Sequence, residues 1–506
     1  MTTPTPPTTD FDVLIIGAGI SGIGAASRLA KRLPRRTFAI LEGREAIGGT
    51  WDLFRFPGIR SDSDLFTFGY AFKPWTSDRS IAAADLILDY LHEAVAENDL
   101  ERHIRFGHRV TAARWSSGPA RWTVTAQRDD GQTVELTSRF LFIGTGYYNY
   151  EQGFSPPFEG AEDFAGTIVH PQFWPEDLDY AGKRVVIIGS GATAVTILPA
   201  IAGTAAHVTM LQRSPSYVLS LPAEDPVNKV LKRLIGPHRA YRITRRQNIW
   251  MQRAIYKAAQ RWPHAARRVL VADVRRRLPK GYDVTTHFNP RYEPWDQRMC
   301  IVPDGDMFEA ISRGDASVAT GQIERFVPEG IRLTSGAVLE ADIIVTATGL
   351  NMLAFGGIAF SVDDTPVDIP ETTVYKSMML SDVPNLAFAV GYTNASWTLK
   401  VDLVCEHTCR LLAHMDAVGA DMVVPIRSGP VERRPVFNLS SGYVQRGSHL
   451  FPHAGASGPW TLEMAYEVDV QRLRFGPVDG PDLQFRYGDQ GTPRASDTTW
   501  TGASVA

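Results

Sequence analysis

The chain has 506 residues, of which 44% are hydrophobic and 21% charged, an ordinary composition for a globular protein of two or three domains. Its 52 Lys and Arg against 55 Asp and Glu exclude a broadly basic nucleic-acid-binding protein, and its three cysteines exclude a disulfide framework. The histidines lack metal-ligand spacing, no apolar run approaches the ~20 residues that cross a bilayer, and the N-terminus lacks the basic region of a signal peptide. We therefore expect a cytoplasmic protein with no metal site and no transmembrane segment.

The first pattern along the chain is a strand, a glycine turn, a helix and a second strand. An apolar run at residues 11–16 precedes the turn, a helical stretch continues to residue 32, and a second apolar run ends at Glu42. This order predicts one βαβ unit. The turn has the GxGxxG spacing and contains Gly17, Gly19, Ile20, Ser21 and Gly22.

These glycines predict a dinucleotide site at the N-terminus of the helix. Gly17 allows the tight turn, Gly19 lets the backbone approach a pyrophosphate, and Gly22 lets the helix pack on the strand. Glu42 can accept both hydrogen bonds of a ribose 2′,3′-diol, whereas it would repel a 2′-phosphate. We therefore expect FAD or NAD in this unit.

Between residues 43 and 182 the elements are less regular. A loop at residues 43–74 is rich in Gly, Trp, Pro and Asp, and a helix with one apolar face is expected near residues 81–98. Two β-like runs follow, joined by the hairpin signal Asp129-Asp130-Gly131.

The βαβ pattern restarts near residue 183. Gly189, Gly191 and Ala194 repeat the spacing with alanine last, and Arg213 and Ser214 stand where the first unit has its carboxylate. A cation and a hydroxyl suit a 2′-phosphate, which predicts NADP here, although Arg213 could also be an ordinary surface arginine. Two dinucleotide sites in one chain indicate electron transfer from NADPH to a bound flavin.

The stretch from Lys229 to Lys280 has a different composition, with sixteen Lys or Arg and Asp273 as its only acid. It predicts a helical insertion, which is either a solvated face or a weak peripheral contact with an anionic membrane surface. Cys405 and Cys409, four residues apart, fit a helix core better than a redox pair.

We expect an α/β protein with two Rossmann-like domains. Apolar runs at residues 338–349 and 385–391 are expected to return to the first domain. The predicted layout is a flexible tail at 1–10, an FAD domain from 11–150 and 341–487, an NADP domain at 151–340 with its helical insertion at about 225–290, and a disordered tail at 488–506.

Two longer motifs carry a family resemblance. FAGTIVHPQFWP at residues 164–175 matches the FxGxxxHxxxWP fingerprint of type I Baeyer–Villiger monooxygenases, and GGTWDLFRFPGIRSD at residues 48–62 matches a second family signature. The chain resembles this family over roughly residues 11–475 and looks closest to its ethionamide-activating branch.

The resemblance implies a reaction. NADPH reduces FAD, the reduced flavin traps O2 as a C4a-peroxyflavin, and an apolar ketone becomes an ester or lactone, with sulfide oxidation as a side activity. Two alternatives stay open: a flavin-containing monooxygenase that oxidises nitrogen or sulfur, and an NADPH–flavin reductase without oxygen insertion. The Trp174-Pro175 pair argues against the first alternative.

The resemblance also implies catalytic residues. Arg298 matches the arginine that stabilises the peroxyanion, and Asp62 matches the carboxylate that orients it. The alternatives are that Asp62 only caps a turn and that Arg298 only contacts NADP or solvent. Gln297 replaces the lysine that many family members have, which makes the phosphate of NADPH more dependent on Arg213.

Other positions follow from the same motifs. Trp397, at the start of an expected helix that faces the flavin, could equally be a packing residue. His170 is expected to couple the two domains rather than transfer protons. The implied FAD contacts are Gly49, Thr50, Trp51, Asp62 and Val110, the implied NADP contacts are Arg60, Ser61, Ser190, Ala192 and Thr193, and the linker residues are Phe164, Gly166, His170 and Trp174.

Overall fold

A computed structural model describes residues 9–437 and 439–487. Most of the predicted N-terminal tail and all of the predicted C-terminal tail lie outside these ranges. Strand β1 (Thr9–Ile16) begins at Thr9, so the tail prediction was wrong for residues 9 and 10, which pair with β6.

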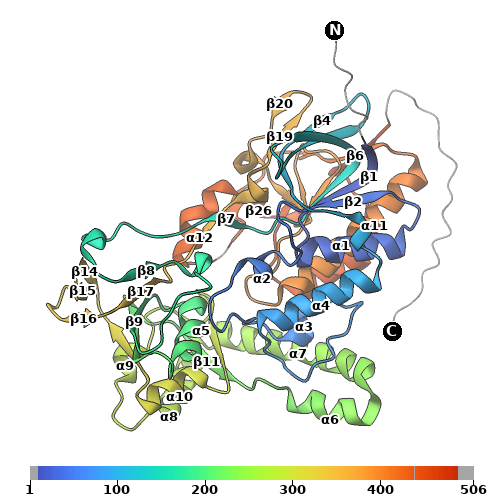
Figure 1. The fold of residues 1–506 in the computed structure, drawn as a ribbon. Helices are drawn as coiled ribbons and strands as arrows, with labels where there is room; N and C mark the ends of the chain where they lie inside the picture. The colour runs from blue at the N-terminus through green and yellow to red at the C-terminus, as the bar shows by residue number, and fades with distance from the viewer. Residues whose placement is uncertain (1–8, 438, 488–506) are drawn as a thin grey trace.

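The first half of the molecule is built on one large mixed sheet (Figure 1). In its centre β1 pairs in parallel with β2 and β6, which confirms the first βαβ unit. The antiparallel pair β5–β6 confirms the hairpin at residues 129–131, and β4 pairs with the other edge of β5. The sheet consists of β2 (Phe38–Leu41), β3 (Ile104–Arg105), β4 (His108–Ser116), β5 (Arg121–Arg128), β6 (Thr133–Ile143), β19 (Ala359–Val362), β20 (Thr365–Pro366) and β23 (Leu386–Phe388) beside β1.

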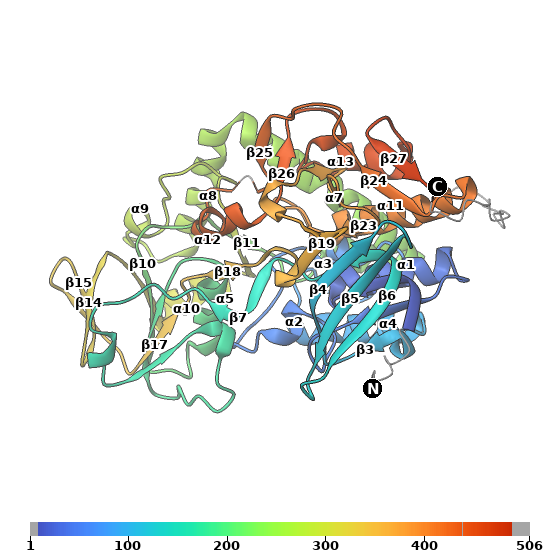
Figure 2. The same ribbon diagram turned by 90° about the horizontal axis from the view of Figure 1, so that it is seen from above.

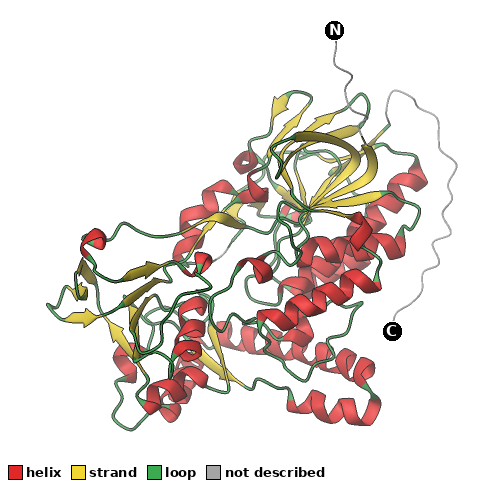
Figure 3. Cartoon of the chain, viewed as in Figure 1, coloured by secondary structure: helices red, strands yellow, loops and turns green. Residues whose placement is uncertain are grey.

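Helices from both ends of the chain cover this sheet. Helix α1 (Ile20–Arg32) packs against α4 (Ala84–Glu97) and α11 (Trp397–Val418). The buried residues of α4 include Ile87, Leu91 and Ala94, which confirms the apolar face that its periodicity predicts. Figure 3 shows these helices below the sheet.

The second half has a parallel sheet in the order β13-β10-β9-β17-β8. It contains the second βαβ unit, with α5 (Ala192–Ile201) between β9 (Arg184–Ile188) and β10 (His207–Gln212), and it is completed by β8 (Thr167–Val169), β13 (Ala316–Thr320) and β17 (Ile343–Thr346). Helix α10 (Asp306–Arg313) packs against α5.

Strand β17 corrects the predicted layout. Its residues were expected to return to the first domain, but Ile343 pairs with Val185 of β9 and with Thr167 of β8. All four residues of β17 are buried, and an apolar run of this kind fits either parallel sheet. The return to the first half follows through β18 (Leu350–Met352), which pairs with β7 (Tyr148–Gly153).

The basic stretch is helical, as predicted. It forms α6 (Pro226–Ile235), α7 (Pro237–Arg261), α8 (Pro263–Arg277) and α9 (Val284–His287), between β11 (Val218–Leu221) and β12 (Cys300–Pro303). Figure 2 shows α7 running along the first half of the molecule, while α8 lies beside the second sheet. The other elements that concern the site are α2 (Thr50–Leu53), α3 (Leu65–Phe68), α12 (Gly442–Gly447) and α13 (Tyr466–Asp469).

Candidate functional site

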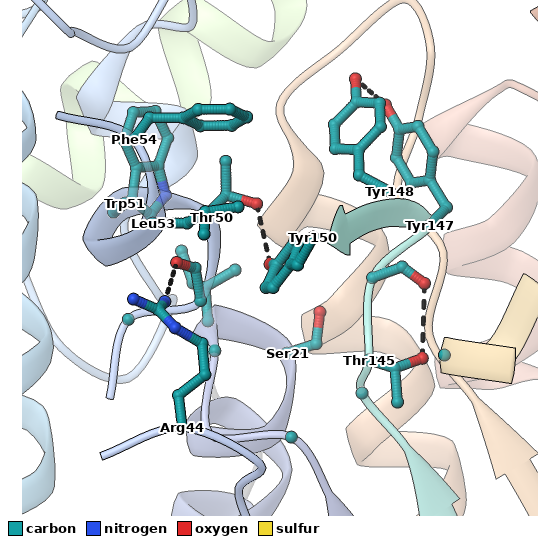
Figure 4. Close-up of a pocket in the computed structure, with 18 of the residues that line it drawn as sticks. Ser21, Arg44, Thr50, Trp51, Leu53, Phe54, Thr145, Tyr147, Tyr148 and Tyr150 are labelled. Atoms are coloured by element: carbon teal, nitrogen blue, oxygen red, sulfur yellow. Dashed lines mark hydrogen bonds between the residues drawn. The ribbon is translucent and has the colours of Figure 1, made fainter. Parts of the chain in front are cut away.

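A cavity of about 780 Å³ lies where the two halves meet (Figure 4). The first glycine turn, the N-terminal residues of α5 and the loop around Asp62 contribute to its wall. Of the predicted site residues, those that line the cavity are Gly17, Gly19, Ile20, Ser21, Glu42, Gly49, Thr50, Trp51, Arg60, Ser61, Asp62, Val110, Ala192, Thr193 and Arg298.

The first glycine turn has the geometry of a dinucleotide cradle. Gly17 has φ of +99°, and a Cβ on Gly22 would lie 1.8 Å from the carbonyl oxygen of Gly17, so the helix and the turn pack closely only with glycine. The N-terminus of α1 has no side-chain cap and no acid in its first turn, which leaves its N–H groups and dipole facing the cavity.

Glu42 is held at the end of β2 by two backbone groups. Its Oε2 accepts a hydrogen bond from the Ala18 N–H at 2.7 Å, and its Oε1 accepts one from the Arg44 N–H at 3.0 Å. Burial raises the pKa of Glu42, against the effect of these hydrogen bonds. The carboxylate is thus fixed at the cavity wall, and each oxygen keeps lone pairs for a ribose diol. The first unit therefore fits a dinucleotide with a free ribose.

Aromatic side chains close the cavity beside this turn. The hydroxyls of Tyr150 and Thr50 lie 3.2 Å apart, and Figure 4 shows Tyr150 pointing toward Thr50. Trp397, at the start of α11, donates from Nε1 to Ser21 Oγ at 3.0 Å and stacks on Tyr147. Trp397 lines the cavity as well as packing, so its two expected roles coexist.

Arg298 and Asp62 come together in the cavity wall. Arg298 Nη2 lies 3.7 Å from Asp62 Oδ1, and the side chains are 39% and 28% exposed. Asp62 is the main reason that the pKa of Arg298 is raised. The cap of α3 is Asp64, whose carboxylate accepts from the N–H groups of Phe66 and Thr67, so Asp62 does not cap this helix.

Three tyrosines, Tyr147, Tyr148 and Tyr443, interact electrostatically with Arg298, and none of them belongs to a predicted motif. The hydroxyls of Tyr147 and Tyr148 lie 2.9 Å apart, and the ring of Tyr148 is 6.3 Å from that of Tyr443 on α12. Burial raises the pKa of Tyr148. The run Tyr-Tyr-Asn-Tyr after a buried strand was the available signal for two of them.

The second glycine turn is open to solvent. Gly189 has φ of +138°, and Gly191 precedes α5, whose N-terminus again has no side-chain cap or acid. Ser190 Oγ donates to the Ser214 carbonyl oxygen at 3.2 Å. Arg213 and Ser214 are exposed at the end of β10 and do not line the cavity, so their contact with a 2′-phosphate stays a prediction. The turn itself fits a second pyrophosphate.

Arg60 and Ser61 lie between the two turns. Arg60 Nη1 forms an ion pair with Asp306 Oδ2 at 2.6 Å, while its Nη2 is buried without a hydrogen-bond partner among the described residues. Ser61 Oγ donates to the Ser63 carbonyl oxygen. Arg60 therefore has a free donor at the side of the cavity where the second dinucleotide is expected.

The fingerprint residues lie outside the cavity. His170 Nε2 is 3.3 Å from the Gly349 carbonyl oxygen, and its ring lies against Gly153, so it contacts the end of β7 and the residue that precedes β18. Burial lowers the pKa of His170, which favours the neutral ring. A Cβ on Gly166 would lie 2.2 Å from the Asp342 carbonyl oxygen.

The aromatic members of the fingerprint are also structural. Phe164 packs edge-on against Phe326, and Trp174 packs edge-on against Tyr180. Both contacts lie within the second half of the molecule, so among these residues the contact with the connecting segments is made by His170, and its role in domain coupling stays a prediction.

Known proteins of this architecture match nearly the whole chain. The family model described as "Flavin-binding monooxygenase-like" matches residues 79–267, and that of an "NAD(P)-binding Rossmann-like domain" matches residues 15–78. The FAD-containing monooxygenase EthA of Mycobacterium tuberculosis is 52% identical over 94% of this chain and 98% of its own length. This chain belongs to the family of FAD-containing monooxygenases.

Two further comparisons agree with that placement. The FAD-binding monooxygenase AlmA of Acinetobacter baylyi is 47% identical over 94% of this chain and 96% of its own length. The structure of an oxidised steroid monooxygenase bound to NADP has a TM-score of 0.74 at 23% identity, over 95% of this chain and 100% of that one, which shows the shared fold. The resemblance found in the sequence motifs is thereby confirmed.

Proposed function

We propose that this protein acts in the cytoplasm as an NADPH- and O2-dependent FAD monooxygenase that converts apolar ketones into esters or lactones, with sulfide oxidation as a side activity. The first glycine turn with Glu42 would hold FAD, and the second turn with Thr193 would hold NADPH. When bound, reduced FAD supplies activated oxygen for transfer to the substrate.

The observation that carries the ketone chemistry is the pairing of Arg298 with Asp62. An insertion into a ketone needs a fixed cation near the carbonyl oxygen, because that oxygen gains negative charge as the new C–O bond forms. Asp62 orients the guanidinium and keeps it charged, and a planar guanidinium retains its direction better than an ammonium.

The cavity wall supports an apolar substrate. The same cavity that Arg298 and Asp62 line is also lined by Phe54, Phe56, Ile59 and Leu350. Apolar walls remove water from the reacting groups, which strengthens the interaction of Arg298 with a developing oxyanion.

The test is a comparison of three proteins: the wild type, Arg298→Ala, and the control Arg291→Ala. Arg291 is an exposed arginine seven residues earlier in the same segment and does not line the cavity. With an aryl-alkyl ketone, we expect ester from the wild type and the control, and at least a 100-fold loss of ester in Arg298→Ala. NADPH-dependent bleaching of the flavin should persist in all three.

Other outcomes would replace the proposal by one of its alternatives. Wild-type protein that releases one hydrogen peroxide per NADPH and forms no ester would be a reductase. Wild-type protein that oxidises amines and sulfides but leaves ketones unchanged would be a nitrogen- or sulfur-oxidising monooxygenase. Ester formation at the wild-type rate in Arg298→Ala would remove the role of this arginine.

A further inference from the structure

The outer face of the helical insertion combines exposed cations with exposed apolar side chains. On α7, Arg239, Arg242 and Arg246 follow one another at helical spacing and form no ion pair with any described residue. Trp250 continues the same face and is 74% exposed. Three arginines followed by a tryptophan therefore lie along one side of this helix.

The flanking helices extend this surface. Leu234, at the end of α6, is 74% exposed, and Trp262, between α7 and α8, is 61% exposed. Helix α7 packs against both α6 and α8, and Figure 1 shows α6 and α8 along the lower edge of the molecule. We call these six side chains, Leu234, Arg239, Arg242, Arg246, Trp250 and Trp262, the insertion face.

The opposite side of α7 fixes the direction in which this face points. Tyr241 donates to the Tyr70 carbonyl oxygen at 2.9 Å, and buried Arg245 donates to the carbonyl oxygens of Phe66, Thr67 and Gly69. Because these contacts occupy the inner side of α7, the helix cannot turn its tryptophan and arginines inward. The apolar side chains of the insertion face stay exposed in the folded protein.

The charge of the face is local. The stretch from Lys229 to Lys280 has sixteen cations and one acid, and the rest of the chain has 36 cations and 54 acids. Ion pairs with acids outside the stretch are formed by Lys229, Lys232, Arg245, Arg253 and Lys257, whereas the three arginines of the insertion face form none with any described residue. An anionic surface would therefore attract the insertion and repel the rest, which gives the contact one orientation. Among residues 9–437 and 439–487, no helix is long and apolar enough to cross a membrane, so such a contact would be peripheral.

We propose that the insertion face docks this protein on the surface of an anionic lipid bilayer. Arginines approach the lipid headgroups, and Trp250, Trp262 and Leu234 enter the boundary between headgroups and acyl chains, where aromatic side chains are favoured. Duplex nucleic acid would use the cations but would leave the exposed tryptophans and leucine without a partner, because its bases are already stacked on one another. A bilayer uses both.

The experiment is sedimentation of the flavin-loaded protein with vesicles. The vesicles are two parts phosphatidylcholine to one part phosphatidylglycerol, with pure phosphatidylcholine as the neutral comparison. Two variants test the two contributions: Arg239→Gln with Arg242→Gln and Arg246→Gln, and Trp250→Ala with Trp262→Ala. The control is Phe475→Ser, which removes a side chain that is 68% exposed outside the insertion.

We expect the wild type and Phe475→Ser to sediment with the anionic vesicles at low salt and to stay in solution with the neutral ones. Each lost arginine should lower the partition coefficient about fivefold, so the triple variant should lose roughly 100-fold. The tryptophan variant should lose about tenfold or more, and brominated lipids should quench wild-type tryptophan fluorescence more than that of this variant.

Three results would overturn the docking proposal. One is a wild type that stays in solution with anionic vesicles, which would make the face a solvated one. Another is binding that the tryptophan substitutions leave unchanged, which would indicate a purely electrostatic partner such as nucleic acid. The third is a Phe475→Ser control that loses as much vesicle binding as the tryptophan variant. Vesicle binding needs neither substrate nor NADPH, so its failure would leave the proposed oxidation untouched.

Discussion

Replacing Gly153 by alanine tests how the fingerprint histidine joins the two halves. Gly153 ends β7, and its φ lies outside the left-handed region, so alanine is free of backbone strain there. Its Cβ, however, would lie 2.1 Å from Cε1 and 2.6 Å from Nδ1 and Nε2 of His170, where ordinary contact begins near 3.4 Å. The imidazole ring must therefore move by more than an ångström.

The cost follows from what the ring would lose. Overpacking at such a site costs about 1–3 kcal/mol. Movement of the ring also breaks its hydrogen bond to the Gly349 carbonyl oxygen, worth about 1 kcal/mol. Gly153→Ala should therefore lower the free energy of unfolding by roughly 2–4 kcal/mol. Gly118→Ala is the matched control, because nothing lies within 4 Å of a Cβ there.

A double-mutant cycle isolates the contact. In an His170→Ala background the space of the ring is empty, so Gly153→Ala should cost little, and the two substitutions should be coupled by more than about 1.5 kcal/mol. The assay is unfolding in urea, followed by circular dichroism, for the four proteins and the control. Additivity within about 0.5 kcal/mol would refute the placement of His170 against Gly153.

Two further predictions concern buried charges. Lys400 Nζ lies 2.5 Å from Asp469 Oδ2, and both side chains are buried. Lys400→Met should therefore lower the free energy of unfolding in urea by about 3–5 kcal/mol, and the double variant Lys400→Met with Asp469→Leu should recover most of that loss. An equal loss of stability in both variants would contradict an ion pair. Burial raises the pKa of Asp64 to about 6, above its unfolded value of 3.8. The contribution of Asp64 to stability is therefore complete below about pH 4 and is lost as the pH rises through 6. The free energy of unfolding of the wild type relative to Asp64→Asn should fall by up to about 3 kcal/mol over that interval. Parallel pH–stability curves of the two proteins would contradict the raised pKa of Asp64.

The features that could be predicted from the sequence are those specified by residues adjacent to one another in the chain. Each glycine turn lies between a strand and a helix that its own flanking residues specify, so both βαβ units could be predicted, as could the apolar face of α4. The sheet that β17 joins could not be predicted, because a short buried strand of three apolar residues and Thr346 fits any parallel neighbour. The cluster around Arg298 was missed because Tyr148 and Tyr443 meet only in the folded chain.

The loop that carries Asp62 shows why the insertion matters to the site. Asp62 faces Arg298, while Asp64, two residues later, accepts a hydrogen bond from Asn248 of α7. Arg245 of the same helix holds the carbonyl oxygens that follow in α3. Composition alone indicates a solvated basic helix, since it does not separate the arginine that points inward from those that point outward. The inner side of α7 thus holds the segment that follows Asp62, so a substitution of Arg245 should shift Asp62 relative to Arg298, the pair that we propose to be catalytic, although Arg245 does not line the cavity.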